Sequence, residues 1–457
     1  MLKSIKKEKK EILNIFDRIK KRDFSGNSGK VIKNSVYQLS EGITYKVGSF
    51  LFTILLARLL MPELFGLYSL VLGTIILFSN FTNMGTGKAI LKFVSNSFGK
   101  KKDSQAKAYL VYILKIQMLF LIGVSLLLIL LSKFLAENYY NKPVFLALLA
   151  GSIYILFSSF QAILETILQA QNNFKAGLFR EIFFEVLRLI LVPAIIWILL
   201  KGDFSKEFIL FMLIISLSLV YLASFIFLLF FSKKDLGFLK SKTKKLTKKQ
   251  KTTLNYFLVA VSTTMFSGIF LGYIDMILLG HFVLSEFIGY YGAAFGVVGA
   301  LVVLSPFSLV LFPVFSRLKG KRLELGFNKS IKIAFLISFA LFFCSFLAAP
   351  FIIKILYGPE YSLSLNIFRV LSLLILSMPL ISIYENYFIS QGKQKLVAIL
   401  LLGTTLLNLG VMYLLITWLI SYSQLAAVFG AAIAIVFSRS FYLFLIILSK
   451  RKYLQKS

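Results

Sequence analysis

Twelve long apolar segments dominate this sequence, and few folds other than a bundle of membrane-spanning helices can accommodate them. Hydrophobic residues make up 58% of the 457 residues, and the mean hydropathy is +0.84. Each segment is long enough to cross a hydrocarbon core of about 30 Å at about 1.5 Å per residue. We therefore predict an all-α integral membrane protein with twelve transmembrane helices. The expected spans are 36–57, 65–83, 108–131, 144–168, 179–200, 208–231, 254–279, 288–312, 329–353, 363–388, 396–417 and 425–448.

The basic residues are distributed unevenly among the loops between these spans. Alternate loops and the two terminal segments hold 40 of the 51 Lys and Arg residues, whereas the intervening loops hold six. Positively charged loops are retained on the cytoplasmic side, so we expect a multi-pass protein of the cytoplasmic (plasma) membrane with both termini inside. These loops also explain the net charge of +32 through contact with membrane lipids, and no nucleic-acid partner is expected. The single Cys344 and single His281 offer no disulfide or metal cluster, so no metal or cofactor is expected.

The longest basic linker divides the spans six and six and defines the expected domains. Residues 1–33 are predicted to form a basic amphipathic segment on the inner leaflet, because isoleucines recur among lysines at helical spacing. Residues 34–231 form an N-lobe, 232–252 the cytoplasmic linker, 253–450 a C-lobe and 451–457 a cytoplasmic tail.

The two halves carry a common pattern. Glu63-Leu-Phe-Gly66-Leu-Tyr68 opens the second span and Glu286-Phe-Ile-Gly289-Tyr-Tyr291 opens the eighth, 223 positions later. Three further matches fall at offsets of 220 or 221 positions. Six spans per half give both halves the same orientation, so we predict two parallel six-helix repeats related by an axis along the membrane normal. Proteins of this kind place a substrate cavity between the halves, which favours transport.

Several motifs in order along the chain resemble one family of transporters. They are Ala57-Arg58-Leu-Leu-Met-Pro62-Glu63-Leu-Phe65-Gly66-Leu-Tyr68, Leu168-Gln-Ala-Gln171-Asn-Asn-Phe174-Lys175, Tyr273-Ile-Asp275-Met-Ile-Leu-Leu-Gly280, Phe312-Pro313-Val-Phe-Ser316 and Tyr357-Gly358-Pro359-Glu360-Tyr361. As a set, the chain resembles the polysaccharide flippases of the multidrug/oligosaccharidyl-lipid/polysaccharide (MOP) superfamily, which implies a MATE-like fold. The loop after the second span does not fit the motif of major facilitators, the other transporters with six plus six helices.

The resemblance implies a flippase that moves a lipid-linked oligosaccharide, joined through phosphate or pyrophosphate to a polyprenyl carrier. It also implies glycan polymerases or glycosyltransferases as candidate partners. A MATE-type cation-coupled multidrug exporter and a lipid II flippase remain alternatives. A membrane glycosyltransferase or polymerase needs large outer loops, and all outer loops here are short. No phosphate-binding loop or catalytic triad pattern is present, so an enzyme is not expected.

Polar residues follow one face of the first span. Asn34, Gln38, Glu41, Tyr45 and Ser49 recur at helical spacing and are predicted to line a cavity. Glu41 is the carboxylate best placed to take up a coupling H⁺ or Na⁺. Charged residues inside a bilayer need a partner or an aqueous cavity.

Other charged residues within the spans are the remaining candidates. Lys46, about 140° around the first helix from Glu41, Lys115, Arg188 and Arg369 are candidate cations for an anionic headgroup. An intrahelical pair with Glu185 gives Arg188 a structural alternative. Asp275 is either a second coupling site or a charge satisfied near the outer boundary. Glu385 has no evident partner, and the side chains of Arg439 and Lys115 are long enough to reach toward the inner face.

The eighth span carries four glycines on one face, which predicts close approach of a neighbouring helix. They are Gly289, Gly292, Gly296 and Gly299.

Overall fold

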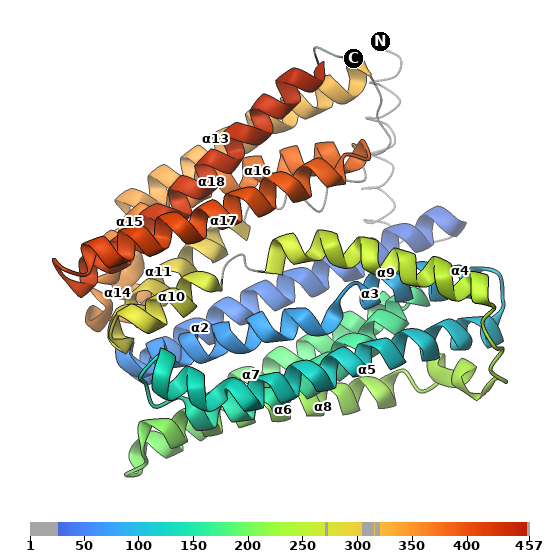
Figure 1. The fold of residues 1–457 in the computed structure, drawn as a ribbon, viewed down its shortest axis with the longest axis horizontal. Helices are drawn as coiled ribbons and strands as arrows, with labels where there is room; N and C mark the ends of the chain where they lie inside the picture. The colour runs from blue at the N-terminus through green and yellow to red at the C-terminus, as the bar shows by residue number, and fades with distance from the viewer. Residues whose placement is uncertain (1–25, 270–272, 304–314, 316–319, 455–457) are drawn as a thin grey trace.

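In the computed structural model, the described residues are 26–269, 273–303, 315 and 320–454, and they form helices without a strand (Figure 1). Ten helices within these ranges are long and apolar enough to cross a membrane. The first of them holds two expected spans, and the seventh expected span is divided between two shorter helices. All twelve expected spans therefore coincide, in whole or in part, with observed helix. The all-α membrane fold is confirmed.

The N-lobe contains the first six spans. Its first long helix, α2, holds two of them, because the chain breaks direction at Met61 (φ 58°), directly before Pro62. Proline lacks the N–H that would continue the helical ladder across this point. The helices are α2 (Gly26–Asn80), α3 (Thr86–Ala89), α4 (Ser95–Gly99), α5 (Asp103–Lys133), α6 (Phe145–Ala170), α7 (Phe174–Lys201) and α8 (Lys206–Phe231), with short segments η1 (Phe81–Asn83), η2 (Ile90–Val94) and η3 (Phe134–Tyr139).

The remaining helices follow the basic linker, which includes the short helix η4 (Asp235–Lys240). They are α9 (Lys248–Ile269), α10 (Ile274–Phe282), α11 (Ser285–Val303), α13 (Lys321–Leu347), α14 (Ala349–Tyr357), η5 (Pro359–Tyr361), α15 (Ser364–Leu371), α16 (Leu374–Ser390), α17 (Gln394–Leu419) and α18 (Gln424–Leu454). The predicted amphipathic segment lies outside the described residues as far as position 25, and so do the last residues of the eighth span.

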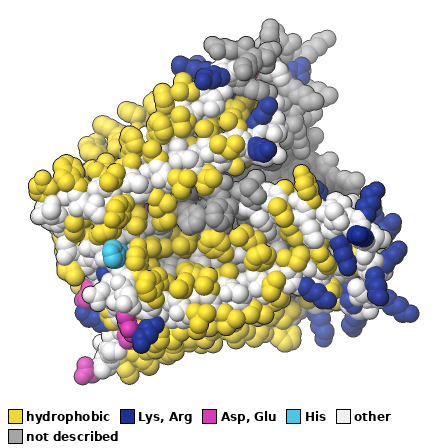
Figure 2. Space-filling model, viewed as in Figure 1, with side chains coloured by type: hydrophobic (Ala, Val, Ile, Leu, Met, Phe, Trp, Pro, Cys, Tyr) yellow, Lys and Arg dark blue, Asp and Glu magenta, His cyan; other side chains and the backbone are white. Residues whose placement is uncertain are grey.

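The helices of the two lobes converge at one end and diverge toward the other (Figure 1). We call the first the closed end, formed by residues 57–66, 139–142, 280–289 and 355–361. Lys and Arg side chains gather at the opposite, basic end (Figure 2). Helix α9 contacts both lobes: Leu254 and Leu258 pack in the N-lobe, and the helix also packs on α17. The start of the C-lobe at residue 253, directly after the linker, stays a prediction.

At the closed end, Gly66 of α2 and Gly289 of α11 bring their helices into backbone contact. A Cβ added at Gly66 would lie 1.7 Å from the carbonyl oxygen of Ser285, and one added at Gly289 would lie 2.0 Å from that of Pro62. Pro62 and Ser285 are 223 positions apart, as are the two glycines. The contact is therefore reciprocal, as an axis relating two parallel repeats requires.

Hydrogen bonds on either side of the glycine pair repeat this reciprocity. The hydroxyl of Tyr361 donates to the carbonyl of Ala57 over 2.8 Å, and Nζ of Lys142 donates to the carbonyl of Gly280 over 2.6 Å. Ala57 and Gly280 are again 223 positions apart. Each lobe thus donates a side-chain hydrogen bond to a backbone carbonyl of the other lobe, and the two carbonyls occupy equivalent positions of the repeat.

A third pair completes the closed end. Arg58 donates through Nε to the carbonyl of Leu356 (2.8 Å), and His281, 223 positions later, donates through Nδ1 to the carbonyl of Tyr139 (2.6 Å). Arg58 of the N-lobe thus donates to the end of α14 in the C-lobe, and His281 of the C-lobe donates to the end of η3 in the N-lobe. Opening this end requires all of these contacts to separate together.

Lys142 is expected to make the closed end sensitive to pH. Burial lowers its pKa from 10.5 to about 8, and separation of the lobes would return the ammonium to water. The open form then binds more protons between these two values, so raising the pH through this window is expected to favour the closed form. Distances between spin labels on the two lobes should report this shift. Lys142→Met is expected to abolish the dependence on pH; an unchanged slope in that variant would contradict the assignment.

Candidate functional site: a polar cavity in the N-lobe

A polar cavity of 720 Å³ lies in the N-lobe and is lined from five helices and η1. Residues 38–46, from the first part of α2, form one side of its wall. Side-chain amides, hydroxyls and aromatic rings outnumber charged groups on its wall. The lining residues are Gln38, Glu41, Gly42, Tyr45, Lys46, Ser79, Asn80, Thr82, Asn83, Gln117, Ser158, Ser159, Gln161, Ala162, Gln169, Arg180, Glu181, Phe184 and Tyr221.

The polar face expected on the first span lies against this cavity over most of its length. Gln38, Glu41 and Tyr45 all line it. Ser49, one turn further, instead accepts a hydrogen bond from Arg188 over 3.2 Å and lines a second, apolar cavity. Asn34 is half-buried and lines neither cavity.

Arg180 of α7 is the electrostatic centre of the cavity wall. Its guanidinium pairs with Glu165 of α6 and with the adjacent Glu181, and it lies 3.3 Å from Oε1 of Glu41. With its amide oxygen turned toward the guanidinium, Gln161 accepts from Nη1 (3.0 Å) and Nε (3.1 Å). Only 7% of the Arg180 side chain is exposed. Its hydrogen-bonding capacity is thus used within the lobe.

Carboxylates outnumber cations in this cluster. Three carboxylates surround Arg180, and one oxygen each of Glu41 and Glu181 is buried without a hydrogen-bond partner among the described residues. The Glu41 carboxylate also lies against Gly177 of α7, where an added Cβ would come within 2.7 Å of Oε2. A small cation or a proton at Glu41 would relieve this excess of negative charge.

Arg188 lies two turns after Arg180 on α7 and does not line the polar cavity. It binds both oxygens of Glu185 at 2.8 and 2.6 Å, which confirms the intrahelical pair expected from the sequence. Its guanidinium also stacks near the rings of Phe52 and Phe184. These contacts join α2 to α7 and leave Arg188 fixed in the packing of the lobe.

The other candidate cations are not brought together. Lys46 lines the polar cavity, whereas Lys115 is exposed on α5 and lines neither cavity. Arg369 on α15 contacts Asn366 (3.4 Å) and the ring of Phe346. Of the four cations proposed for the headgroup, Lys46 alone borders the polar cavity in the described part of the chain.

A second buried polar cluster lies in the C-lobe. Asp275 of α10 accepts a hydrogen bond from Tyr291 (2.9 Å), and Glu385 accepts one from Tyr442 (2.9 Å). Arg439 is buried near both carboxylates and does not extend to the inner face. The expected coupling role of Asp275 stays a prediction. Within the described ranges, no group of three His, Cys, Asp or Glu side chains could hold a metal ion.

Sequence reasoning missed the α6 wall of the cavity, although a signal was present. Gln161, Glu165 and Gln169 recur every fourth residue in an apolar span, and Gln169 donates to Glu165 over 3.1 Å. Such spacing places the three side chains on one helical face. The same test that identified the polar face of the first span would have found them.

The fold and this cavity define a class: a multi-pass, all-helical membrane protein with a polar cavity in its N-lobe. The sequence comparison then gives the family. The chain belongs to the family described as polysaccharide biosynthesis protein, whose model matches residues 31–319. No curated protein sequence matches significantly.

Several solved structures share this fold at low sequence identity. One is described as an inward-facing multidrug resistance MATE family transporter of the MOP superfamily, with TM-score 0.67, 15% identity and coverage of 92% of this chain and 98% of that one. Another is the lipid II flippase MurJ in an inward closed conformation (TM-score 0.66, 15% identity, coverage 90% and 87%). A third is a MOP superfamily transporter from Pyrococcus furiosus, described as having a binding pocket of reversed polarity (TM-score 0.60, 16% identity, coverage 93% and 96%).

Proposed function

We propose that this protein is a flippase that carries a lipid-linked oligosaccharide from the cytoplasmic to the outer leaflet of the plasma membrane. The basic end is then cytoplasmic, and the headgroup enters from that side. Glycosyltransferases that build the glycan, or polymerases that extend it, are the partners this proposal implies.

The polar cavity is the observation that carries the proposal. Its wall offers amides that both donate and accept, hydroxyls that do either, and the rings of Tyr45, Phe184 and Tyr221. A saccharide presents the complementary surface of many hydroxyls with apolar ring faces. A compact hydrophobic drug would cover most of these polar groups without offering them partners, at a cost for each. This favours a glycan headgroup over the multidrug alternative.

The headgroup would cross the membrane by alternating access, in which the cavity opens to one side of the membrane at a time. The closed end is held by reciprocal contacts between the lobes, and the cavity lies toward the basic end. Release on the far side requires those contacts to separate while the lobes approach one another at the basic end. The headgroup drives this exchange only if its interaction free energy differs between the two states.

Reconstitution tests the proposal directly. Proteoliposomes carrying a fluorescent polyprenyl-pyrophosphate oligosaccharide are mixed with a membrane-impermeant glycosidase, and the cleaved fraction is followed with time. We expect the protein to raise the rate at which inner-leaflet headgroups become accessible, compared with protein-free vesicles. An unchanged rate would contradict the proposal. Faster flipping of lipid II than of the oligosaccharide would favour the lipid II alternative, and efflux of cationic dyes without flipping would favour the multidrug alternative.

Glu41 is the proposed coupling site for H⁺ or Na⁺. Its unpartnered oxygen and the excess of carboxylates around Arg180 support this role. Glu41→Gln keeps the shape of the side chain and leaves two carboxylates to pair with Arg180. We expect this variant to flip headgroups at a rate that no longer responds to an imposed pH or Na⁺ gradient, whereas the parent protein does respond. Equal gradient dependence in both proteins would remove Glu41 from coupling.

A further inference from the structure

One part of the polar cavity carries Gln161, Arg180 and Glu181, and we call it the α6–α7 wall. Arg180 has five N–H groups, and all of them are used within the lobe. Nη1 donates to Glu181, Nη2 donates to Glu165 and to Glu41, and Nη1 and Nε donate to the turned amide of Gln161. The guanidinium therefore has no donor left for an anion that enters the cavity.

Three oxygen atoms on the same cavity have no donor facing them. They are Oε2 of Glu41, Oε1 of Glu181 and Oε1 of Gln117 on α5, each buried without a hydrogen-bond partner among the described residues. Only 3% of Glu181 and 4% of Gln117 are exposed. A ligand that covers such an acceptor without offering a donor loses free energy. The ligand that suits this cavity therefore presents O–H or N–H groups to these oxygens.

The balance of charge favours the same kind of ligand. Glu41, Glu165 and Glu181 share one guanidinium, and their side chains are 12%, 16% and 4% exposed. Negative charge therefore exceeds positive charge in this cluster even when Glu41 binds a proton. A carboxylate placed against the wall would meet like charge that water screens only weakly. A hydroxyl would meet no such repulsion, and an ammonium would form charge-assisted hydrogen bonds.

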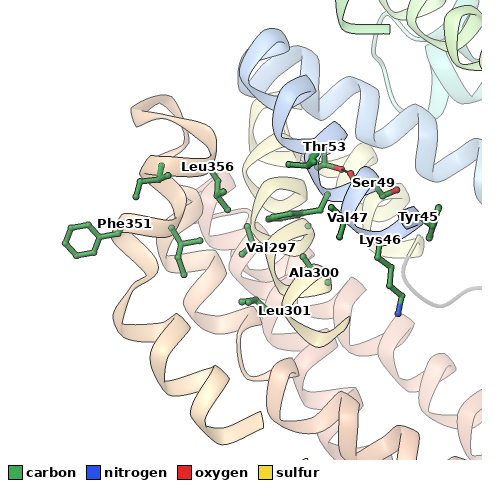
Figure 3. Close-up of a pocket in the computed structure, with 16 residues that line it drawn as sticks. Tyr45, Lys46, Val47, Ser49, Thr53, Val297, Ala300, Leu301, Phe351 and Leu356 are labelled. Carbon is green, nitrogen blue, oxygen red and sulfur yellow. Dashed lines mark hydrogen bonds between the residues drawn. The ribbon is translucent and has the colours of Figure 1, made fainter. Parts of the chain in front are cut away.

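Lys46 is the other cation that lines the polar cavity, and it belongs to α2 rather than to the α6–α7 wall. It follows Glu41 by five residues, which places it about 140° around the helix from that carboxylate. It also lines the neighbouring apolar cavity, and Figure 3 shows its side chain extending away from α2 there. A ligand carboxylate that reaches Lys46 would leave the α6–α7 wall to another part of the glycan.

We propose that the α6–α7 wall selects the glycan by charge: the sugar that contacts it is neutral or carries a free amine, and a sugar carrying a carboxylate is rejected. This selection rests on the proposed flippase function and names the class of glycan that is transported. Glu181 is the specificity-determining residue, because its free oxygen accepts from a hydroxyl or an ammonium and an ionised carboxyl cannot donate to another. Glu41 remains the proposed coupling residue.

Three lipids that differ in one substituent test the selection. Each is a polyprenyl-pyrophosphate disaccharide, and its two sugars are both glucose, both glucuronate or both glucosamine. The full-length protein is reconstituted in proteoliposomes, and a membrane-impermeant pyrophosphate hydrolase releases the whole disaccharide from accessible headgroups. One enzyme thus reports on all three lipids, and its rates in detergent, where every headgroup is accessible, serve as the reference.

We expect the glucosyl lipid to flip at least about tenfold faster than the glucuronosyl lipid, a difference equivalent to about 1.4 kcal/mol. The loss of one hydrogen bond to a buried acceptor is sufficient for an effect of this size. The glucosaminyl lipid should flip at least as fast as the glucosyl lipid. Equal rates for the glucosyl and glucuronosyl lipids would overturn the proposal, and so would faster flipping of the glucuronosyl lipid.

Glu181→Gln tests the role of the wall itself. The amide oxygen can still accept from Arg180, while the amide nitrogen can donate to a sugar carboxylate. We expect the ratio of glucosyl to glucuronosyl rates to fall below about threefold, because both the repulsion and the missing donor are removed. Glu137→Gln is the matched control, since Glu137 is exposed, lies 4.0 Å from Lys133 and lines neither cavity. An unchanged ratio in folded Glu181→Gln would overturn the proposal.

Gln117→Lys gives a second test that leaves every partner of Arg180 in place. It adds a cation to the cavity from α5, so the rate for the glucuronosyl lipid should rise relative to that for the glucosyl lipid. Thermal unfolding identifies which of the variants are folded. A parental ratio in folded Gln117→Lys would overturn the selection by charge, even if Glu181→Gln fails to fold.

Failure of the selection and failure of the flippase function give different results. Flipping of all three lipids at equal rates by the parent protein would overturn the selection and leave the flippase function standing. Flipping of none of them above the rate in protein-free vesicles would overturn both. Flipping of the glucosyl and glucosaminyl lipids with rejection of the glucuronosyl lipid would support both.

Discussion

Replacing Gly66 with alanine is expected to slow headgroup translocation at least about 100-fold, equivalent to about 2.7 kcal/mol at 1.36 kcal/mol per factor of ten. The added Cβ would lie 1.7 Å from the carbonyl oxygen of Ser285 and 2.8 Å from the backbone nitrogen of Gly289. Both neighbours are backbone atoms, so no change of rotamer can relieve the overlap. The helices must separate, and the closed end cannot form as it does in the parent protein.

The internal repeat provides a second, equivalent test. Gly289→Ala places its Cβ 2.0 Å from the carbonyl oxygen of Pro62, so we expect the same defect from the opposite lobe. Either substitution alone separates α2 from α11, and the double variant should therefore be little worse than each single one. Such non-additivity is typical of residues that share one contact.

Spin-label distances across the closed end would show the cause. Labels at Asn141 and Leu284, both exposed, can be introduced after Cys344, the single cysteine, is replaced by serine. We expect longer and broader distances in Gly66→Ala and Gly289→Ala. Gly403→Ala on α17 is the control, because an added Cβ there meets nothing within 4 Å. Parental distances and rates in Gly66→Ala would refute the observed packing.

Much of this architecture could be predicted because it follows from local patterns. Apolar length identifies spans, and uneven basic loops identify the end at which Lys and Arg gather. The matching motifs around Gly66 and Gly289 identified a repeat, and the structure places these same glycines in contact. Of the four glycines expected to pack on the eighth span, Gly289, Gly292 and Gly296 lie against neighbouring helices, whereas an added Cβ at Gly299 would meet nothing within 4 Å.

The environment of each charged residue was harder to predict. The spacing of Glu185 and Arg188 within one helix identified their pair, since residues three apart share a face. Arg180 takes partners from α2, α6 and α7. The sequence gives the period of each helix but not its rotation relative to its neighbours, which is decided by packing. For the same reason hydropathy could not distinguish Lys46, at a cavity, from Lys115, on an exposed face.

The second large effect is expected at Arg180. Arg180→Gln removes the cation that Glu41, Glu165 and Glu181 share. Breaking a buried ion pair by deleting one partner commonly costs about 3–5 kcal/mol, because a charge remains buried without compensation. The side chain of Arg180 is 7% exposed, so water offers little screening. We expect a clear drop in unfolding temperature in detergent or nanodiscs.

A charge-matched series would separate lost charge from lost packing. Arg180→Gln combined with Glu41→Gln, Glu165→Gln and Glu181→Gln removes both the cation and the carboxylates it neutralises, and should recover most of the lost stability. Arg180→Lys should fall between the parent and Arg180→Gln, because an ammonium lacks the planar fork that reaches several carboxylates at once. Arg369→Gln, which loses one contact of 3.4 Å with Asn366 and a ring contact, should change stability by less than about 1 kcal/mol.

The combined variant also bears on transport. If the carboxylates serve mainly to hold Arg180, neutralising all members of the cluster leaves a polar wall, with Lys46 as its remaining charge, that can still bind a headgroup. If the excess negative charge is the coupling device, the recovered variant should flip headgroups without responding to a cation gradient, as Glu41→Gln is expected to do. Failure of the combined variant to regain stability would show that the cluster contributes through the shape of its packing rather than through charge, and would contradict the electrostatic account of this site.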